Sequence, residues 1–160
     1  LGAALASSGA VALYYVEGLN PAVECEFEDR ISVDSASLED SMDELSTTND
    51  KPDLICVGCP HCSLGEIRLL ARYLRHRRLS CDFWVCTSHA LKVAADRMGY
   101  SDLIVGSGGV MVSDTCMVVS PIEDLGFDVV GVDSAKAANY IPSMCGLDVV
   151  FDDWKNLVRL

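Results

Sequence analysis

Short apolar runs alternate with amphipathic stretches over most of the chain. The run at residues 53–58 predicts a buried strand, and residues 64–77 predict a helix whose apolar positions share one face. The same rhythm continues to the end of the chain, with strands predicted at 83–86, 103–105, 116–119, 129–132 and 149–150, and helices at 89–98, 135–140 and 154–160. Strands that alternate with helices indicate an α/β fold, with three layers and a mainly parallel sheet flanked by helices.

The first third of the chain has a less regular pattern. Residues 2–17 are rich in alanine and predict a helix, whereas residues 22–51 are acidic and rich in serine. Within that acidic segment we expect a short strand at 30–33 and a helix capped by Ser37. We therefore expect one α/β domain over residues 1–160, with 22–51 as a connecting segment inside it. Because the chain starts at Leu1 and not at Met, we expect it to be a fragment or a processed product.

Polar and reactive side chains gather where predicted strands end. They occupy residues 58–61, 87–89 and 133–136, each directly after an apolar run. In a parallel sheet, ligands bind outside the carboxyl ends of the strands. The sequence therefore predicts a functional site along that edge of the sheet.

Charge and composition exclude several classes of protein. The net charge of −12 disfavours nucleic acid as a partner, because an acidic surface repels phosphate backbones. No apolar run approaches the roughly 20 residues of a membrane span, and the start of the chain lacks the basic residues of a signal peptide. The eight cysteines fall partly inside apolar runs, which favours a reducing, cytoplasmic environment over a secreted disulfide framework.

The cysteines nevertheless leave several chemistries open. Cys59 and Cys62 form a Cys-x-x-Cys pair between a predicted strand and a predicted helix, as in a thiol oxidoreductase. The same pair could be half of a zinc site, or Cys59 could be one thiolate ligand of an iron–sulfur cluster. Cys116, between a polar corner and an apolar run, could simply be a core residue. Ser134 and Lys136 begin a predicted helix, where they could cap it or bind a carboxylate or phosphate.

Five segments in consistent order resemble the large subunit of the aconitase X family, a branch of the aconitase superfamily. They are residues 2–11, 58–64, 84–88, 114–119 and 134–140. The family's large subunit is much longer than this chain, which resembles its carboxyl-terminal part. The resemblance implies the aconitase-superfamily type of α/β domain.

The same resemblance implies a hydro-lyase that uses an iron–sulfur cluster, of the 4Fe-4S type, as a Lewis acid. Cys59 and Cys116 match two cluster ligands, and the third ligand is expected outside this chain. Ser88, Ser134 and Lys136 match positions that face a small-molecule substrate. No catalytic residue is expected here, because the base should come from the small swivelling-domain subunit. The isolated chain should therefore be inactive and free of metal.

Two substrates are implied by the family. One is mevalonate 5-phosphate, which archaeal members dehydrate to an anhydromevalonate phosphate in isoprenoid synthesis, and the alternative is cis-3-hydroxy-L-proline. The sequences of residues 58–63 and 143–146 resemble the archaeal branch, which favours mevalonate 5-phosphate as the substrate. The chain departs from the family pattern at four positions: His89, Asp133, Ala135 and Asn139. The Arg that is lost at His89 and the acid that is gained at Asp133 make the pocket less attractive to an anion. A cluster-free structural domain is a further alternative.

Overall fold

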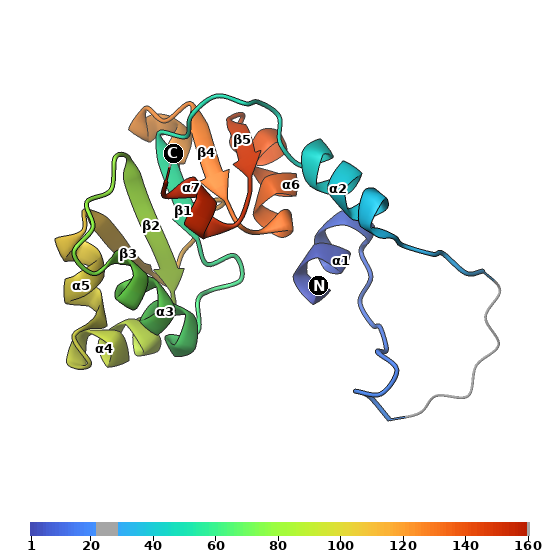
Figure 1. Ribbon diagram of the computed structural model, residues 1–160, viewed down its shortest axis with the longest axis horizontal. Coiled ribbons are helices and arrows are strands. Elements are labelled where there is room, and N and C mark those ends of the chain that lie inside the picture. Colours follow the sequence, from blue (N-terminus) through green and yellow to red (C-terminus); the bar gives the residue numbers. More distant parts are fainter. Residues whose placement is uncertain (22–28, 160) are drawn as a thin grey trace.

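The computed structural model describes residues 1–21 and 29–159 and shows the predicted α/β architecture (Figure 1). Residues 22–28 of the predicted connecting segment, and Leu160 of the last predicted helix, lie outside the described residues. The strands are β1 (Leu54–Val57), β2 (Asp82–Thr87), β3 (Gly109–Ser113), β4 (Val129–Val132) and β5 (Asp148–Phe151). The helices are α1 (Gly2–Gly9), α2 (Ser35–Glu44), α3 (Leu64–Leu74), α4 (His89–Arg97), α5 (Tyr100–Gly106), the 3₁₀ helix η1 (Ile122–Leu125), α6 (Ala135–Met144) and α7 (Trp154–Leu157).

The five strands form one sheet in the order β3-β2-β1-β4-β5. Every neighbouring pair is parallel, and β1 in the centre pairs with β2 on one side and β4 on the other. The predicted fold class is thus confirmed, and the sheet is parallel throughout. This order has a topological switch point between β1 and β4, where the connections leave in opposite directions.

Two apolar cores, one on each face, make the sheet the middle of three layers. In β1, Leu54 and Cys56 belong to the core that includes α6, while Ile55 and Val57 belong to the core that includes α3. Such alternation follows from the two-residue period of a strand. All four residues are almost completely buried, because helices cover both faces. This double burial explains why the strand appears in the sequence as an uninterrupted apolar run.

Two predicted strands are wrong. Residues 103–105 lie within α5, where Ser101, Ile104 and Ser107 are buried at a spacing of three residues. That spacing is helical, and two of its members are polar, so the sequence pattern concealed it. Residues 116–119 form a turn closed by bonds from the amides of Val119 and Ser120 to the carbonyl of Cys116. The actual third strand, β3, lies between these two segments.

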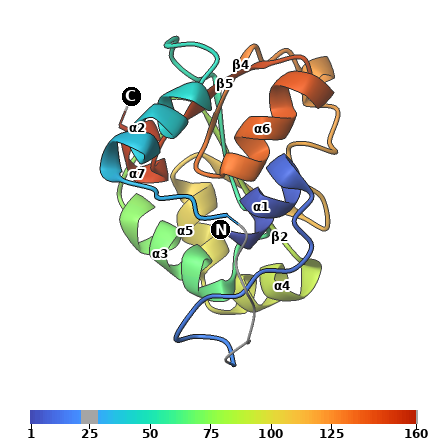
Figure 2. The same ribbon diagram turned by 90° about the vertical axis from the view of Figure 1, so that its right-hand side faces the viewer.

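The amino-terminal part also differs from expectation. The helix predicted over 2–17 ends at Gly9, and residues 30–33 form no strand; Ile31 is 88% exposed there, without a sheet edge to pair with. The second helix begins at Ser35, because Asp34 and not Ser37 is its N-cap and accepts the Ser37 amide. Helix α6 continues past the predicted end to Met144. Helix α1 packs against α6 (Figure 2), which places the start of the chain over the carboxyl edge of the sheet.

Candidate functional site

The loops after β1 and β4 leave the sheet at its switch point. Gly58 and Cys59 follow β1 directly, and Asp133 and Ser134 follow β4 directly. Because β1 and β4 are neighbours, their carboxyl ends lie beside each other. The position is the one at which open parallel sheets bind their ligands. Strand order therefore joins two segments that are distant in the sequence.

A glycine allows the β1 loop to pass close to β2. Gly58 has a φ of +102°, and a Cβ there would lie 2.2 Å from the carbonyl oxygen of Cys86. That oxygen accepts the amide of Cys62 at 2.8 Å, and the buried Thr87 hydroxyl donates to the Cys62 carbonyl at 2.7 Å. These contacts fix the backbone on both sides of Cys59.

Ser134 joins the β1 loop to α6. Its hydroxyl donates to the carbonyl oxygen of Cys59 and accepts the amide of Ala137 at 3.3 Å, so it also caps α6. Both the capping role and the proximity to the predicted site are therefore present in one side chain. Lys136 follows in the first turn of this helix.

A cavity of about 310 Å³ opens at this point. Its walls include Cys59, Ser134 and Lys136, three of the predicted site residues. Ser88 and Cys116 do not line it. The remaining lining residues come mainly from α1, α3 and the switch-point loops: Leu1, Ala3, Ala4, Val57, Gly58, Pro60, Cys62, Glu66, Leu69, Leu70, Asp133, Ala135 and Trp154. The contributions of α1 and α3 were not predicted, because they depend on long-range packing.

Ser88 lies at the start of α4. Its hydroxyl accepts the Leu91 amide at 3.3 Å, which makes it the N-cap of that helix. Asp114 adds a second cap by accepting the amide of His89 at 2.8 Å. The structure thus gives Ser88 a capping contact and leaves the predicted substrate contact as an expectation.

Cys59 and Cys116 both take part in the core on the α6 face of the sheet. Four buried cysteines belong to this core: Cys56, Cys59, Cys86 and Cys145. The partly buried Cys116 packs against it. Burial raises the pKa of Cys59; the charge of Lys136 opposes this rise, and the neighbouring Cys116 thiol adds to it. The structure therefore places both cysteines singled out in the sequence at the same core.

Cys62 lines the same cavity as Cys59 but packs in a different core. It belongs to the core on the α3 face, opposite to that of Cys59. Burial raises the pKa of Cys62 to about 12 and also raises the pKa of Cys59, whereas the reactive first thiol of a Cys-x-x-Cys oxidoreductase needs a lowered pKa. Both observations argue against a redox pair or half of a zinc site formed by Cys59 and Cys62.

Asp133 gives the cavity a titratable carboxyl group. The residue as a whole is exposed, but desolvation of its carboxyl group in the cavity wall raises its pKa to about 6. The carboxylates of Asp153 and Glu66 contribute to the rise. The positive charge of Lys136 therefore acts in a cavity whose walls also contain acidic groups.

The donor set matches part of a cluster site. Among residues 1–21 and 29–159, no group of three or more His, Cys, Asp or Glu side chains is arranged to hold a metal ion. Cys59 and Cys116 provide two thiols at one core, of the type that iron–sulfur clusters require. They fit a cluster whose third ligand comes from elsewhere.

The described part of the chain also contains no helix with the length and apolar character needed to cross a membrane.

Comparisons with known proteins identify the family of this chain. The family model described as "Aconitase X third domain" matches residues 52–160. The phosphomevalonate dehydratase large subunit of Methanothermobacter thermautotrophicus is 62% identical over 163 aligned residues, which cover 99% of this chain and 41% of that protein. A more distant relative, the cis-3-hydroxy-L-proline dehydratase of Pseudomonas aeruginosa, is 29% identical and is aligned over 94% of this chain and 28% of its own length.

A solved structure gives the same result for the fold. The crystal structure of Thermococcus kodakaraensis aconitase X in its holo-form superimposes with a TM-score of 0.86 at 34% identity, covering 99% of this chain and 42% of that one. The chain thus spans well under half the length of the relatives that it matches.

Proposed function

Because this chain belongs to the aconitase X family, we propose that it forms part of the large subunit of a hydro-lyase that dehydrates mevalonate 5-phosphate. The observation that supports this most is the 62% identity to a phosphomevalonate dehydratase large subunit across nearly the whole chain. Dehydration of cis-3-hydroxy-L-proline is the second candidate, and the identity of 29% to such an enzyme makes it the weaker one. The product of the first reaction is an anhydromevalonate phosphate, used in isoprenoid synthesis.

Cys59 and Cys116 are proposed to hold an iron–sulfur cluster of the 4Fe-4S type, with the third ligand from outside this chain. Their shared place in one core supports this role. When bound, such a cluster supplies a Lewis acid for the leaving hydroxyl group. Ser134 keeps the peptide of Cys59 in place through its hydrogen bond to that carbonyl oxygen. The chain thus contributes two-thirds of the protein ligands and their immediate support.

Lys136 is proposed to attract the anionic group of the substrate. It lines the cavity from the first turn of α6, where the amides of the helix start also favour negative charge. Ser134 is proposed to take part in the same subsite, and Ser88 to contact substrate once the complete enzyme has assembled. The acidic Asp133 weakens this attraction, so further positive groups must come from the rest of the enzyme.

The complete enzyme is proposed to include a small swivelling-domain subunit, which supplies the catalytic base, and the remainder of the large subunit. Within it, we propose that residues 1–160 act as one domain and that 22–51 connect its parts. The contact of α1 with α6, including a bond from the Asn139 amide to the Ser7 carbonyl at 3.4 Å, supports one unit. The many uncrosslinked cysteines suit a reducing cytoplasm.

The proposal is tested by assaying the complete enzyme with both substrates. We expect dehydration of mevalonate 5-phosphate and little reaction with cis-3-hydroxy-L-proline. Lys136→Met should lower kcat/KM for the phosphorylated substrate by about 10- to 100-fold, because a charge-assisted contact is lost. Lys92→Met is the matched control, since Lys92 pairs with Asp96 on α4 and does not line the cavity. A higher kcat/KM for hydroxyproline, or no reaction by fully cluster-loaded enzyme, would contradict the proposal.

A further inference from the structure

The two cysteine loops are joined by a histidine. His61 lies two residues after Cys59, and its Nε2 atom is 3.0 Å from the carbonyl oxygen of Thr115. That oxygen belongs to the peptide group that links Thr115 to Cys116. The contact thus reaches from the loop of one thiol to the backbone directly beside the other thiol, across 54 positions of sequence.

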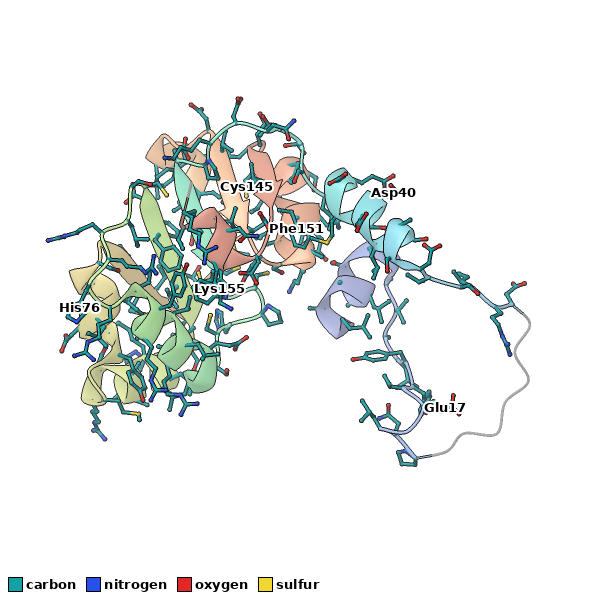
Figure 3. All side chains as sticks on the ribbon, in the orientation of Figure 1. Glu17, Asp40, His76, Cys145, Phe151 and Lys155 are labelled. Carbon is teal, nitrogen blue, oxygen red and sulfur yellow. The ribbon has the colours of Figure 1, made fainter. Side chains whose placement is uncertain are left out.

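The rest of the Cys116 loop is attached elsewhere. The Asp114 amide donates to Thr87 at the end of β2 at 3.0 Å, and Met117 is completely buried in the core. The Cys145 thiol of α6, labelled in Figure 3, lies 3.7 Å from the carbonyl oxygen of Val118. Within the part of the chain that the structure describes, the His61 contact is the one hydrogen bond that ties this loop directly to the β1 loop.

From this geometry we infer that His61 is a positioning residue that holds the Cys59 and Cys116 loops at the separation needed for a shared cluster. The inference rests on the proposed function, in which these two thiols are cluster ligands. The backbone of Cys59 is already fixed by Ser134, so a link from His61 to the Thr115 carbonyl transmits that fixed position to Cys116. Preorganised ligands bind more tightly, because less conformational entropy is lost on binding.

The chemistry of the contact defines the state of the imidazole ring. A carbonyl oxygen only accepts hydrogen bonds, so Nε2 must carry the hydrogen atom. An Nε2 atom occupied in this way is not free to coordinate iron, so His61 acts on the two loops through this hydrogen bond.

A positioning role differs measurably from a purely structural one. The contact is solvent-exposed, and one exposed hydrogen bond adds little to folding stability. Loss of this bond should therefore change thermal stability slightly but cluster retention more. Gln offers an amide donor at about the same reach as Nε2, whereas Leu has a similar size and no donor.

The test uses the complete enzyme, with the whole large subunit and its small subunit, purified anaerobically. The variants are His61→Leu, His61→Gln and the control His76→Asn; His76 lies on the outer surface of the domain, far from Cys145 (Figure 3). Two quantities are measured: the rate of cluster loss to an iron chelator, and the yield of a Cys59–Cys116 cross-link formed in cluster-free protein by a short bifunctional thiol reagent.

His61→Leu should lose its cluster about fivefold faster than the wild type and give a lower cross-link yield, with an unfolding midpoint within about 2 °C. His61→Gln should restore both quantities toward wild type, and His76→Asn should leave them unchanged. Equal rates and yields in wild type and His61→Leu would overturn the inference, as would a large fall in the midpoint that Gln does not restore. A wild-type enzyme without any cluster would instead refute the proposed function, while the cross-link comparison would still test the tether.

Discussion

Gly58→Ala tests how the backbone presents Cys59. The residue has a φ of +102°, and its new methyl group would lie 2.2 Å from the Cys86 carbonyl oxygen. Atoms cannot approach so closely, so the β1 loop and the end of β2 must move apart. That movement would disturb the 2.8 Å hydrogen bond from the Cys62 amide to the same oxygen.

The magnitude follows from two separable costs. A side chain at positive φ costs about 1–2 kcal/mol, and disruption of a buried hydrogen bond costs roughly 1–3 kcal/mol. We therefore expect Gly58→Ala to lower the free energy of unfolding by about 3 kcal/mol. Gly99→Ala is the matched control, because Gly99 has a φ of +72° but no atom within 4 Å of its would-be Cβ. It should cost only about 1 kcal/mol.

Urea unfolding, followed by the fluorescence of Trp84 and Trp154, measures both variants. For a domain of this size, each kcal/mol corresponds to about 2–4 °C in the thermal midpoint, which provides a second measurement. If the two alanine variants have the same stability, the close approach of Gly58 to Cys86 is not a real constraint and the reasoning fails.

Three further predictions follow from single contacts. Ser134→Ala should lower the free energy of unfolding in urea by about 2 kcal/mol, because it removes a helix cap and a hydrogen bond to the β1 loop. Ser88→Ala removes only a cap and should lower it by about 1 kcal/mol. Equal losses in the two variants would refute the link between the β1 loop and α6. Burial raises the pKa of Asp133 from 3.8 to about 6, so the folded state binds more protons between these values and stability should fall as pH rises through this window. Asp133→Asn should flatten that fall, and an unchanged slope in urea midpoints measured from pH 4 to 7 would count against it. Burial also raises the pKa of Cys86 to about 12, which should protect this thiol from alkylation. Mass-spectrometric mapping of the cluster-free native protein should therefore show Cys86 unlabelled and the partly exposed Cys116 labelled. Equal labelling of the two thiols would contradict the packing.

The central strands could be predicted from sequence because their burial is uniform. The continuous apolar runs of β1 and β4 are bounded by glycine or polar residues, and both lie in the interior of the sheet. Residues 103–105 are also apolar, but the buried face of this segment consists of Ile104 together with Ser101 of α5 and its C-cap Ser107. Apolar periodicity cannot reveal a helix whose buried face is partly serine.

The site was predictable in part. The polar residues after each strand predicted an active edge, and a family resemblance assigned roles to Cys59 and Cys116. The sequence could not reveal that Ser134 bonds to the Cys59 carbonyl, because this depends on β1 and β4 being neighbours. Nor could it reveal that α1 covers the cavity, since that contact spans almost the whole chain.

Iron and sulfide analysis of the complete enzyme tests the central claim most directly. Wild type and three variants, Cys59→Ser, Cys116→Ser and Cys81→Ser, would be purified anaerobically with their partner subunit. Cys81 is the control, because it precedes β2 at the opposite edge of the sheet and lies outside the core that contains the other two. We predict about four iron atoms per large subunit in wild type and Cys81→Ser, and loss of most iron in the other two variants. Unchanged iron in Cys59→Ser and Cys116→Ser would contradict the assignment of these thiols as cluster ligands.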